Sequence, residues 1–393
     1  MNKNNWTYRK LGEVATLVAD GDWIESKDQS EQGIRLIQTG NIGNGFFKSK
    51  DDKPHFISEE TMSRLNCTEI FQGDCLVSRL PDPVGRACLI PNIGCRMITA
   101  VDCSIIRFSN DYLPQFFVDY SQSAKYRNSV NNNTTGTTRK RISRKNLEKI
   151  PIPIPPLAEQ QRIVAELDLL SSIIEKKKAQ LKELDQLAQS IFYNMFGDPI
   201  TNEKGWKVQA LSTVCDVRDG THDSPKYVDN GYPLITSKNV VNGTISFDNV
   251  NLISERDLIA INARSKVDDG DIIMPMIGTI GKPTIVIKTR EFAIKNVALI
   301  KFSEAKRVLN IYIQKLLDSE SYSRFIKEQN RGGTQKFISL GMIRKLPTPL
   351  PPLPLQQEFA SKVEAIERQK SLIQQSIDEV QTLFDSRMDY WFG

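Results

Sequence analysis

Two stretches of the chain carry apolar residues at intervals that alternate between four and three positions. In the first stretch these positions are Ile163, Leu167, Leu170, Ile174, Leu181, Leu184, Ala188, Ile191 and Met195. In the second stretch they are Phe359, Val363, Ile366, Ile373, Ile377, Val380 and Phe384. Lys177 and Lys370 interrupt the two series. This spacing is typical of a coiled-coil seam and predicts a helix over residues 158–196, roughly 58 Å long at 1.5 Å per residue.

The two stretches are copies of one repeated segment. The letters IPIPIPPLAEQQRIVAELD begin at Ile150, and LPTPLPPLPLQQEFASKVE begins 196 residues later at Leu346. The copies align without a gap as far as Gly197 and Gly393. Upstream the likeness is looser, as between LIQTGNIGNG and LITSKNVVNG, and the offset drifts. A repeat of this length indicates one architecture that is built twice, with a variable block of about 150 residues and a more constant block of about 45 in each copy.

The repeat also predicts how the long helices pack. A narrow apolar seam of this length needs a partner of similar length, so we expect the two helices to pair with each other in antiparallel orientation. The alternative is two unrelated packing helices. Pro354 and Leu355 stand where the first copy has Ala158 and Glu159, so we expect the second helix to begin later.

The variable blocks have a different pattern. Short apolar runs such as CSIIRF, DIIMPMI and VALIKF are separated by clusters of Gly, Pro, Asn and Asp, which is typical of compact sheet domains. We therefore expect an α+β fold with two mixed α/β domains, separated by two long helices that form an antiparallel coiled coil. The two halves would be related by a pseudo-twofold internal repeat.

Composition places the chain among folded proteins. Of its 393 residues 39% are hydrophobic and 25% are charged. No apolar run is long enough for a membrane span, and the first residues lack the apolar core of a signal peptide, so we expect a cytoplasmic protein that does not contact a membrane. The six cysteines include no C-x-x-C pair, which argues against a disulfide framework or a zinc site.

Signatures of catalysis are weak in this sequence. The segment GTIGKP lacks the glycine and the serine or threonine of a phosphate-binding loop, because Met276 and Pro283 stand at those positions. The amino-methyltransferase motif N-P-P-[YF] does not occur, and the histidines are limited to His55 and His222. The residues E-A-K from Glu304 to Lys306 match part of the motif of a metal-dependent nuclease that uses carboxylates and a lysine. No convincing Asp precedes them in the sequence.

Positive charge is concentrated before each constant block. The sixteen residues TTGTTRKRISRKNLEK, from Thr134 to Lys149, hold six cationic side chains and one acidic one, for a net charge of +5. The corresponding NRGGTQKFISLGMIRK contains four cationic side chains and no acidic one. Such segments, flanked by glycine and rich in threonine, favour contact with phosphate over an ordinary solvated loop.

The chain resembles the specificity subunits of type I restriction-modification systems. The resemblance rests on IPIPIPPLAEQQRIV and LPTPLPPLPLQQEFA, each preceded by G-x-T-x-K-x-I-S and followed by a long helix. It implies target recognition domains at residues 1–149 and 198–345, and conserved helical regions at 150–197 and 346–393. It also implies binding to double-stranded DNA, two methyltransferase subunits and restriction subunits. S-adenosylmethionine, ATP and Mg would be used by those partners, and this chain would need no cofactor and perform no catalysis.

Candidate contact residues follow from charge and from side-chain chemistry. Asn and Gln suit adenine and Arg suits guanine. The candidates for DNA contact are Gln38, Asn41, Asn44, Arg139, Lys140, Arg141, Arg144, Lys145, Ser237, Lys238, Asn239, Asn242, Arg331, Gln335 and Lys336. The Asn residues have an alternative role, because Asn and Gly are common in turns for backbone reasons. The candidates for partner contact, which lie off the helical seam, are Arg162, Glu166, Glu175, Lys362 and Glu367.

Two other functions remain open at this stage. One is a coiled-coil scaffold that joins proteins and binds DNA only incidentally. The other is a stand-alone nuclease or methyltransferase. Sequence-selective DNA binding that sharpens when methyltransferase subunits are added would separate a specificity subunit from a scaffold, and turnover by the isolated chain would support an enzyme.

Overall fold

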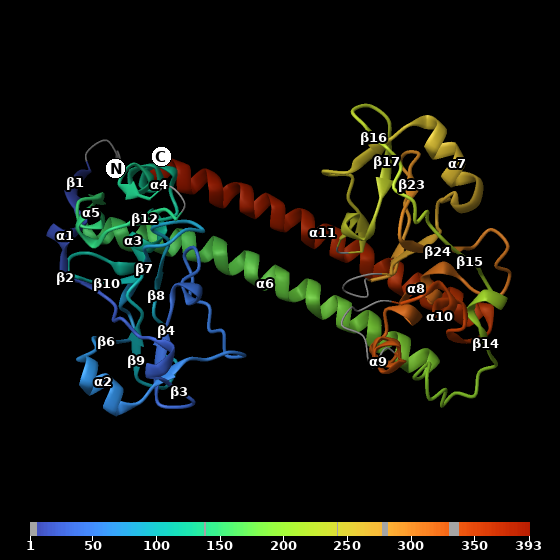
Figure 1. Cartoon of the computed structure of the whole chain (residues 1–393), viewed down its shortest axis with the longest axis horizontal. Helices are drawn as coiled ribbons and strands as arrows, with labels where there is room; N and C mark the ends of the chain where they lie inside the picture. Colours follow the sequence, from blue (N-terminus) through green and yellow to red (C-terminus); the bar gives the residue numbers. More distant parts are fainter. Residues whose placement is uncertain (1–5, 137–138, 242, 277–281, 330–337) are drawn as a thin grey trace. The chain divides into compact units, whose positions relative to one another are not determined.

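The computed structural model describes residues 6–136, 139–241, 243–276, 282–329 and 338–393. The chain divides into two compact units, Met1–Lys178 with Gln375–Gly393, and Ala179–Gln374. Both divisions fall inside a long helix, α6 (Leu157–Phe196) or α11 (Leu353–Phe392). Each unit therefore contains one variable block together with one part of α6 and one part of α11, coloured green and red in Figure 1.

The first unit is built around two sheets. An antiparallel four-stranded sheet has the order β2 (Ala15–Asp20), β10 (Cys103–Phe108), β7 (Cys75–Ser78), β8 (Ala87–Leu89). A five-stranded sheet has the order β3 (Gln29–Ser30), β5 (Phe56–Ile57), β4 (Ile34–Ile37), β9 (Met97–Thr99), β6 (Glu69–Ile70), with β4 and β9 parallel. The remaining elements are β1 (Thr7–Lys10), α1 (Leu11–Val14), α2 (Glu59–Leu65), α3 (Pro114–Tyr120), α4 (Ala124–Asn132), β11 (Thr134–Thr135), β12 (Arg141–Ile142), α5 (Arg144–Leu147) and β13 (Pro151–Ile154).

The second unit repeats this topology, except that among its described residues the mixed sheet has no strand equivalent to β6. Its antiparallel sheet has the order β15 (Asp216–Asp219), β24 (Val297–Lys301), β21 (Ile272–Pro275), β22 (Thr284–Ile285). Its other sheet has the order β16 (Tyr227–Val228), β20 (Asn251–Ile253), β17 (Tyr232–Ile235), β23 (Ala293–Ile294), with β17 and β23 parallel. The remaining elements are β14 (Val208–Ala210), β18 (Val240–Val241), β19 (Thr244–Ile245), α7 (Glu255–Ser265), α8 (Asn310–Leu317), α9 (Glu320–Gln329), α10 (Leu340–Arg344) and β25 (Pro347–Pro349). The predicted α+β repeat is confirmed.

The long helices have equal lengths of 40 residues and equivalent starts. The first begins at Leu157, one residue before the predicted position. The expectation that the second begins later is wrong, because it starts at Leu353, the repeat equivalent of Leu157. Pro354 is tolerated because the first-turn N–H groups of a helix have no acceptor within the helix.

Polar side chains join the two helices within each unit. In the first unit the guanidinium of Arg387 pairs with Glu166, and the indole N–H of Trp391 donates to the same carboxylate at 3.2 Å. In the second unit Lys370 Nζ lies 2.8 Å from Asp185 Oδ1. The first pair joins the first half of α6 to the second half of α11, and the second pair joins the second half of α6 to the first half of α11. An antiparallel coiled coil requires this arrangement. The lysine that interrupts the second seam thus forms an interhelical ion pair.

A buried glutamine joins each long helix to its domain. Gln160 Oε1 accepts a hydrogen bond from the Leu113 N–H at 2.7 Å, and its Nε2 donates to the carbonyls of Asp111 and Pro155. Gln356 makes the same set of bonds to Leu309, Arg307 and Pro351. The N–H and C=O groups of a buried side-chain amide need hydrogen-bond partners. These bonds therefore explain why the first residue of each Q-Q pair is a glutamine in both copies of the repeat.

Candidate nucleic-acid interface

The basic segment of the first unit forms a short hairpin. Strand β11 pairs with β12, and α5 follows directly. Arg139, Lys140 and Lys145 are exposed, and none of the three forms an ion pair within the described residues. Arg144 is held by Glu148 at 3.5 Å, one helical turn away. The hairpin therefore presents free cationic side chains to solvent, which is the arrangement that phosphate contact requires.

The hairpin is fixed to one end of the four-stranded sheet. The Ile142 N–H donates to the Arg79 carbonyl at 3.2 Å, and Arg141 pairs with Asp102 at 3.0 Å. The buried Arg79 pairs in turn with Asp20 at 2.9 Å, at the last residue of β2. This end of the sheet thus holds two ion pairs next to the hairpin, Arg141 with Asp102 and Arg79 with Asp20.

The loop after β4 contains three of the predicted base-reading residues. Asn41 is buried, its Oδ1 accepts from the Gln38 N–H at 3.0 Å, and its Nδ2 donates to the Lys48 carbonyl at 2.9 Å. Its amide therefore has the turn-forming role that was the alternative. Asn44 is half-buried and accepts from Arg127 at 3.2 Å. Gln38 is half-buried at the start of the same turn, and its contact with a base stays a prediction.

Sequence reasoning missed the residue that shapes this loop. The buried Arg86 donates from Nε to the Ile42 carbonyl at 2.7 Å and from Nη2 to the Thr39 carbonyl at 2.8 Å. Its Nη1 donates to carbonyls of the loop between β7 and β8, on Leu80, Pro81 and Pro83. A buried guanidinium without a carboxylate partner is costly unless carbonyls saturate it, so Arg86 locks two adjacent loops together.

The second unit keeps the loop but changes its side chains. Asn239 is buried, and its Oδ1 accepts from the Thr236 N–H at 3.0 Å, so it repeats the role of Asn41. Lys238 is exposed and without an ion pair in the described part of the chain, and Ser237 is half-buried. The other predicted DNA-contact residues of this half, Asn242, Arg331, Gln335 and Lys336, lie outside the described residues.

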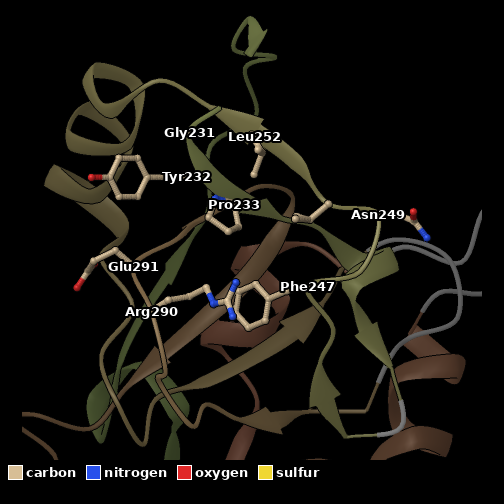
Figure 2. A pocket seen from close by; sticks show the side chains of 9 residues that line it. Gly231, Tyr232, Pro233, Phe247, Asn249, Leu252, Arg290 and Glu291 are labelled. Atoms are coloured by element: carbon tan, nitrogen blue, oxygen red, sulfur yellow. The ribbon is translucent and has the colours of Figure 1, made fainter. Parts of the chain in front are cut away.

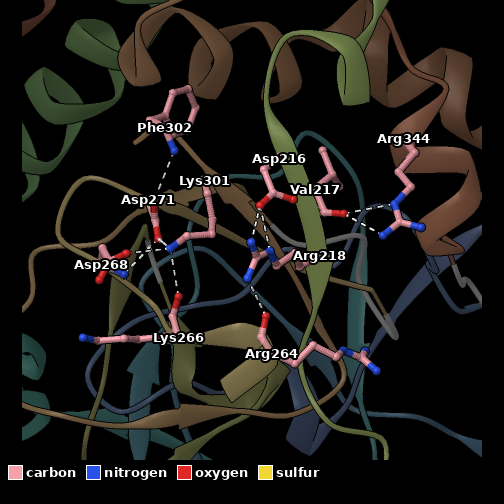
Figure 3. A network of polar contacts seen from close by, with 10 residues as sticks. All are labelled: Asp216, Val217, Arg218, Arg264, Lys266, Asp268, Asp271, Lys301, Phe302 and Arg344. Carbon is pink, nitrogen blue, oxygen red and sulfur yellow. Dashed lines mark hydrogen bonds and ion pairs between the residues drawn. The ribbon is translucent and has the colours of Figure 1, made fainter. Parts of the chain in front are cut away.

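Polar contacts surround β15 and β24 of the second unit, and one group of them centres on Lys301 at the end of β24 (Figure 3). Lys301 Nζ lies 2.8 Å from Asp271 and 2.7 Å from Asp268, and it donates to the Lys266 carbonyl. Burial tends to lower the pKa of Lys301, but the hydrogen bonds to the two carboxylates outweigh it, and the net shift is upward. The ammonium group of Lys301 has three acceptors within its own domain, so we assign this lysine a structural role.

The second unit also contains a hollow of about 540 Å³ on the sheet that includes β17 and β20 (Figure 2). Among its lining residues, the guanidinium of Arg290 lies over the Phe247 ring, 4.6 Å from the centroid. At the matching position of the first unit Arg35 lies over Phe56 and donates to the carbonyl of Ser49, whereas the second unit has Pro233 there. The two domains therefore differ in the side chains and contacts at this position.

The predicted partner-contact residues have unequal surroundings. Glu166 binds Arg387 and Trp391, so its carboxylate joins α6 to α11 and is not free for a partner. Arg162 lies over the Trp391 ring, 4.7 Å from its centroid, beside Glu159. Ion pairs occupy the other three: Glu175 with Lys178, Lys362 with Glu358, and Glu367 with Lys370. Partner contact by Arg162, Glu175, Lys362 and Glu367 stays a prediction.

Two features are absent from the described part of the chain. None of its groups of His, Cys, Asp and Glu could hold a metal ion. None of its helices is long and apolar enough to cross a membrane.

Comparison with known proteins decides the family. The family described as "Type I restriction modification DNA specificity domain" matches twice, at residues 3–186 and 203–382, once for each repeat. The chain belongs to this family. Curated members include the type I restriction enzyme EcoKI specificity subunit of Escherichia coli K12, which is 23% identical over 92% of this chain and 82% of its own length. The MjaIX specificity subunit of Methanocaldococcus jannaschii is 25% identical over 92% and 87%.

The match to another specificity subunit is partial. The EcoBI subunit of Escherichia coli is 22% identical over 67% of this chain, and the match spans 61% of the EcoBI subunit. Solved structures agree in fold. The S subunit of a type I restriction-modification system from M. genitalium has a TM-score of 0.53 at 13% identity, covering 99% of this chain and 96% of its own. A chain from a type I R-M system studied for complex assembly has a TM-score of 0.58 at 18% identity, covering 98% and 97%.

Proposed function

We propose that this member of the specificity-domain family is the DNA-binding specificity subunit of a type I restriction-modification complex. Each variable block, residues 1–149 and 198–345, reads one half of an asymmetric, gapped DNA site. The conserved helical regions, residues 150–197 and 346–393, set the spacing between the two halves. The observation that carries this proposal is the repetition of one strand order and one glutamine bond set with different side chains on the loops.

The division of labour within each domain follows from the chemistry of its surface. Free cations such as Arg139, Lys140 and Lys145 would contact phosphates, which provides affinity and orientation but no sequence information. Sequence would be read by side chains that reach base edges in the grooves. The rigid loop that Arg86 supports is suited to this purpose, because a fixed loop loses little conformational entropy on binding.

The coiled coil would dock two methyltransferase subunits, since near-equivalent helices offer near-equivalent surfaces. Restriction subunits would join through that assembly. Methyl transfer from S-adenosylmethionine and cleavage driven by ATP and Mg would be carried out by these partners, and this chain would contribute no catalytic residue. A cytoplasmic location, where the genome and incoming DNA meet, would fit this role.

The test is a comparison of methylated motifs in a host with and without the gene, in the presence of the partner subunits. The proposal expects one gapped motif with two dissimilar halves that disappears with the gene. An unchanged methylation pattern, together with intact assembly of the partner proteins on this chain, would instead support a scaffold.

A further inference from the structure

The two domains differ at the end of their four-stranded sheets. In the first unit the last residue of β2, Asp20, pairs with the buried Arg79. In the second unit the equivalent last residue of β15 is Asp219, which is 8% exposed. Its Oδ2 lies 2.8 Å from His222 Nε2, and its Oδ1 pairs with Arg264 Nη2. A buried carboxylate here holds an arginine that is not buried.

A longer helix brings this arginine to the sheet. Helices α2 and α7 both follow a serine cap, Ser58 and Ser254, at equivalent positions in the repeat. Helix α2 has 7 residues and α7 has 11, so α7 continues for about one more turn and carries Arg264 in that turn. The equivalent position in the first unit is Thr68, which follows the end of α2. The additional cation therefore belongs to the second domain alone.

The guanidinium of Arg264 is oriented but not saturated. Its side chain is 63% exposed, although Nη2 is held by the buried Asp219. The three N–H groups on Nε and Nη1 have no acceptor among the described residues, and Nη2 also lies 3.5 Å from the Asp219 carbonyl, which is a long contact. One N–H of Nη1 and one N–H of Nη2 point in the same direction at the end of the guanidinium, and this planar pair of donors matches the O6 and N7 acceptors of guanine.

His222 reinforces the positive charge at this place. Its Nδ1 lies 2.9 Å from Asn296 Oδ1, so both ring nitrogens face oxygen atoms. The hydrogen bonds to Asn296 and Asp219 raise the pKa of His222 above its ordinary value. Two neighbouring cations have other partners: Lys295 lies 2.5 Å from Ser224 Oγ, and Arg218 pairs with Asp216. When His222 is protonated, the single carboxylate of Asp219 contacts two cations, His222 and Arg264. These three side chains together then carry a net positive charge.

The position of Arg264 in the second unit corresponds to the candidate interface of the first unit. There the same end of the sheet carries Arg141, Asp102 and the basic hairpin. In the second unit the Ile338 N–H donates to the Met276 carbonyl at 3.0 Å, which repeats the bond from Ile142 to Arg79. Arg264 thus lies at the sheet end that corresponds to the basic hairpin of the first domain.

We propose that Arg264 reads a guanine in the half-site of the second domain, and that Asp219 is the positioning residue that orients it. This inference rests on the proposed function. It assigns to one residue a sequence preference that the first domain does not share, because Thr68 has no donor pair at that position.

The experiment uses the full chain together with its modification and restriction subunits. In the Arg264→Met variant we expect one guanine position of one half-site to be relaxed, and affinity for the cognate site to fall roughly 10- to 100-fold. The other half and the spacing should not change. Arg264→Lys, which keeps the charge but not the planar fork, should bind non-cognate DNA as the wild type does and still lack the guanine preference. Asp219→Asn should relax the same position to a smaller extent.

Arg256→Met is the matched control, because Arg256 is exposed on the same helix and has no ion pair within the described residues. It should leave the motif unchanged. The inference is overturned if Arg264→Met methylates the wild-type motif with wild-type affinity. It is also overturned if binding weakens equally on all sequences with a shallower salt dependence, which is the sign of a phosphate contact. If the wild-type complex methylates no gapped motif, the proposed function fails and the inference fails with it.

Discussion

A buried acid at the contact between the first domain and its long helix provides a sharp test of the energetics. Asp119 on α3 is 5% exposed, and its Oδ2 has no hydrogen-bond partner among the described residues, while Oδ1 accepts from Gln115 at 2.9 Å. Burial raises the pKa of Asp119 to about 8, with a further contribution from Asp168 on α6. The carboxyl group is therefore expected to be neutral in the folded protein at pH 7.

The sign of the pH dependence follows from proton binding. Between the unfolded pKa of 3.8 and the folded pKa of about 8, the folded state binds more protons at Asp119 than the unfolded state does. The contribution of Asp119 to the free energy of unfolding must then fall as pH rises through that window, by about 1.4 kcal/mol per pH unit. At pH 7 the accumulated decrease is about 4 kcal/mol relative to acid pH.

The substitution Asp119→Asn removes this decrease, because an amide does not titrate. The new N–H₂ group lacks an acceptor and costs about 1–3 kcal/mol. We expect the variant to be more stable than the wild type at pH 7 by about 1–3 kcal/mol and its stability to be less dependent on pH. Asp52→Asn, an exposed substitution in the same unit, should change neither quantity.

The assay is hydrogen exchange of the buried amides of α3 and of the part of α6 that ends at Lys178, measured from pH 5 to pH 8 after correction for intrinsic rates. This readout reports on the first unit alone, which matters because a chain of two units does not unfold in one step. If the protection of the wild type did not fall with rising pH, or if Asp119→Asn were less stable than the wild type at pH 8, the buried neutral carboxyl would be refuted.

Two further predictions concern the helices and the basic hairpin. Leu170→Asp, at a position 9% exposed, should destabilise the coiled coil by about 3–5 kcal/mol in thermal or urea unfolding, whereas Leu169→Asp, 62% exposed, should change it by less than about 0.5 kcal/mol. Equal stability of these two variants would contradict the seam assignment. Neutralising Arg139, Lys140 and Arg141 together should weaken binding to all DNA sequences and reduce the slope of log affinity against log salt by about 0.9 for each phosphate that the hairpin no longer binds. An unchanged slope would show that the hairpin does not touch DNA.

The helices could be predicted almost to the residue because their signal is local. Seam positions recur every three or four residues, and Gly197 ends the first helix with a φ of +76°, a conformation that glycine adopts without strain. The start of the second helix differs from the prediction because Pro354 is no barrier where it stands. A proline at the second helical position removes only an N–H that has no partner in the helix.

The candidate site was harder to predict because its bonds connect distant segments. Glu166 has the spacing of an outward-facing residue, yet its partner Arg387 is on the other long helix. Asn41 has the chemistry of an adenine reader, yet a turn uses its amide. Arg264 could not be found from the sequence, since its significance depends on the additional turn of α7 and on a carboxylate in a separate strand. Periodicity determines which face of an element is buried, but not which polar groups meet across the fold.

In the proposed function two independent readers share one coiled coil. Exchanging residues 1–149 for the corresponding block of a relative, and then mapping the methylated motif of the complete system in its host, tests this independence. We expect one half of the gapped site to change while the other half and the spacing are retained. A four-residue insertion at matched seam positions in both long helices, about one turn, should alter the spacing and keep both halves. If the block exchange altered both halves at once, the two blocks would not read DNA separately, and the chain would not contain two independent readers.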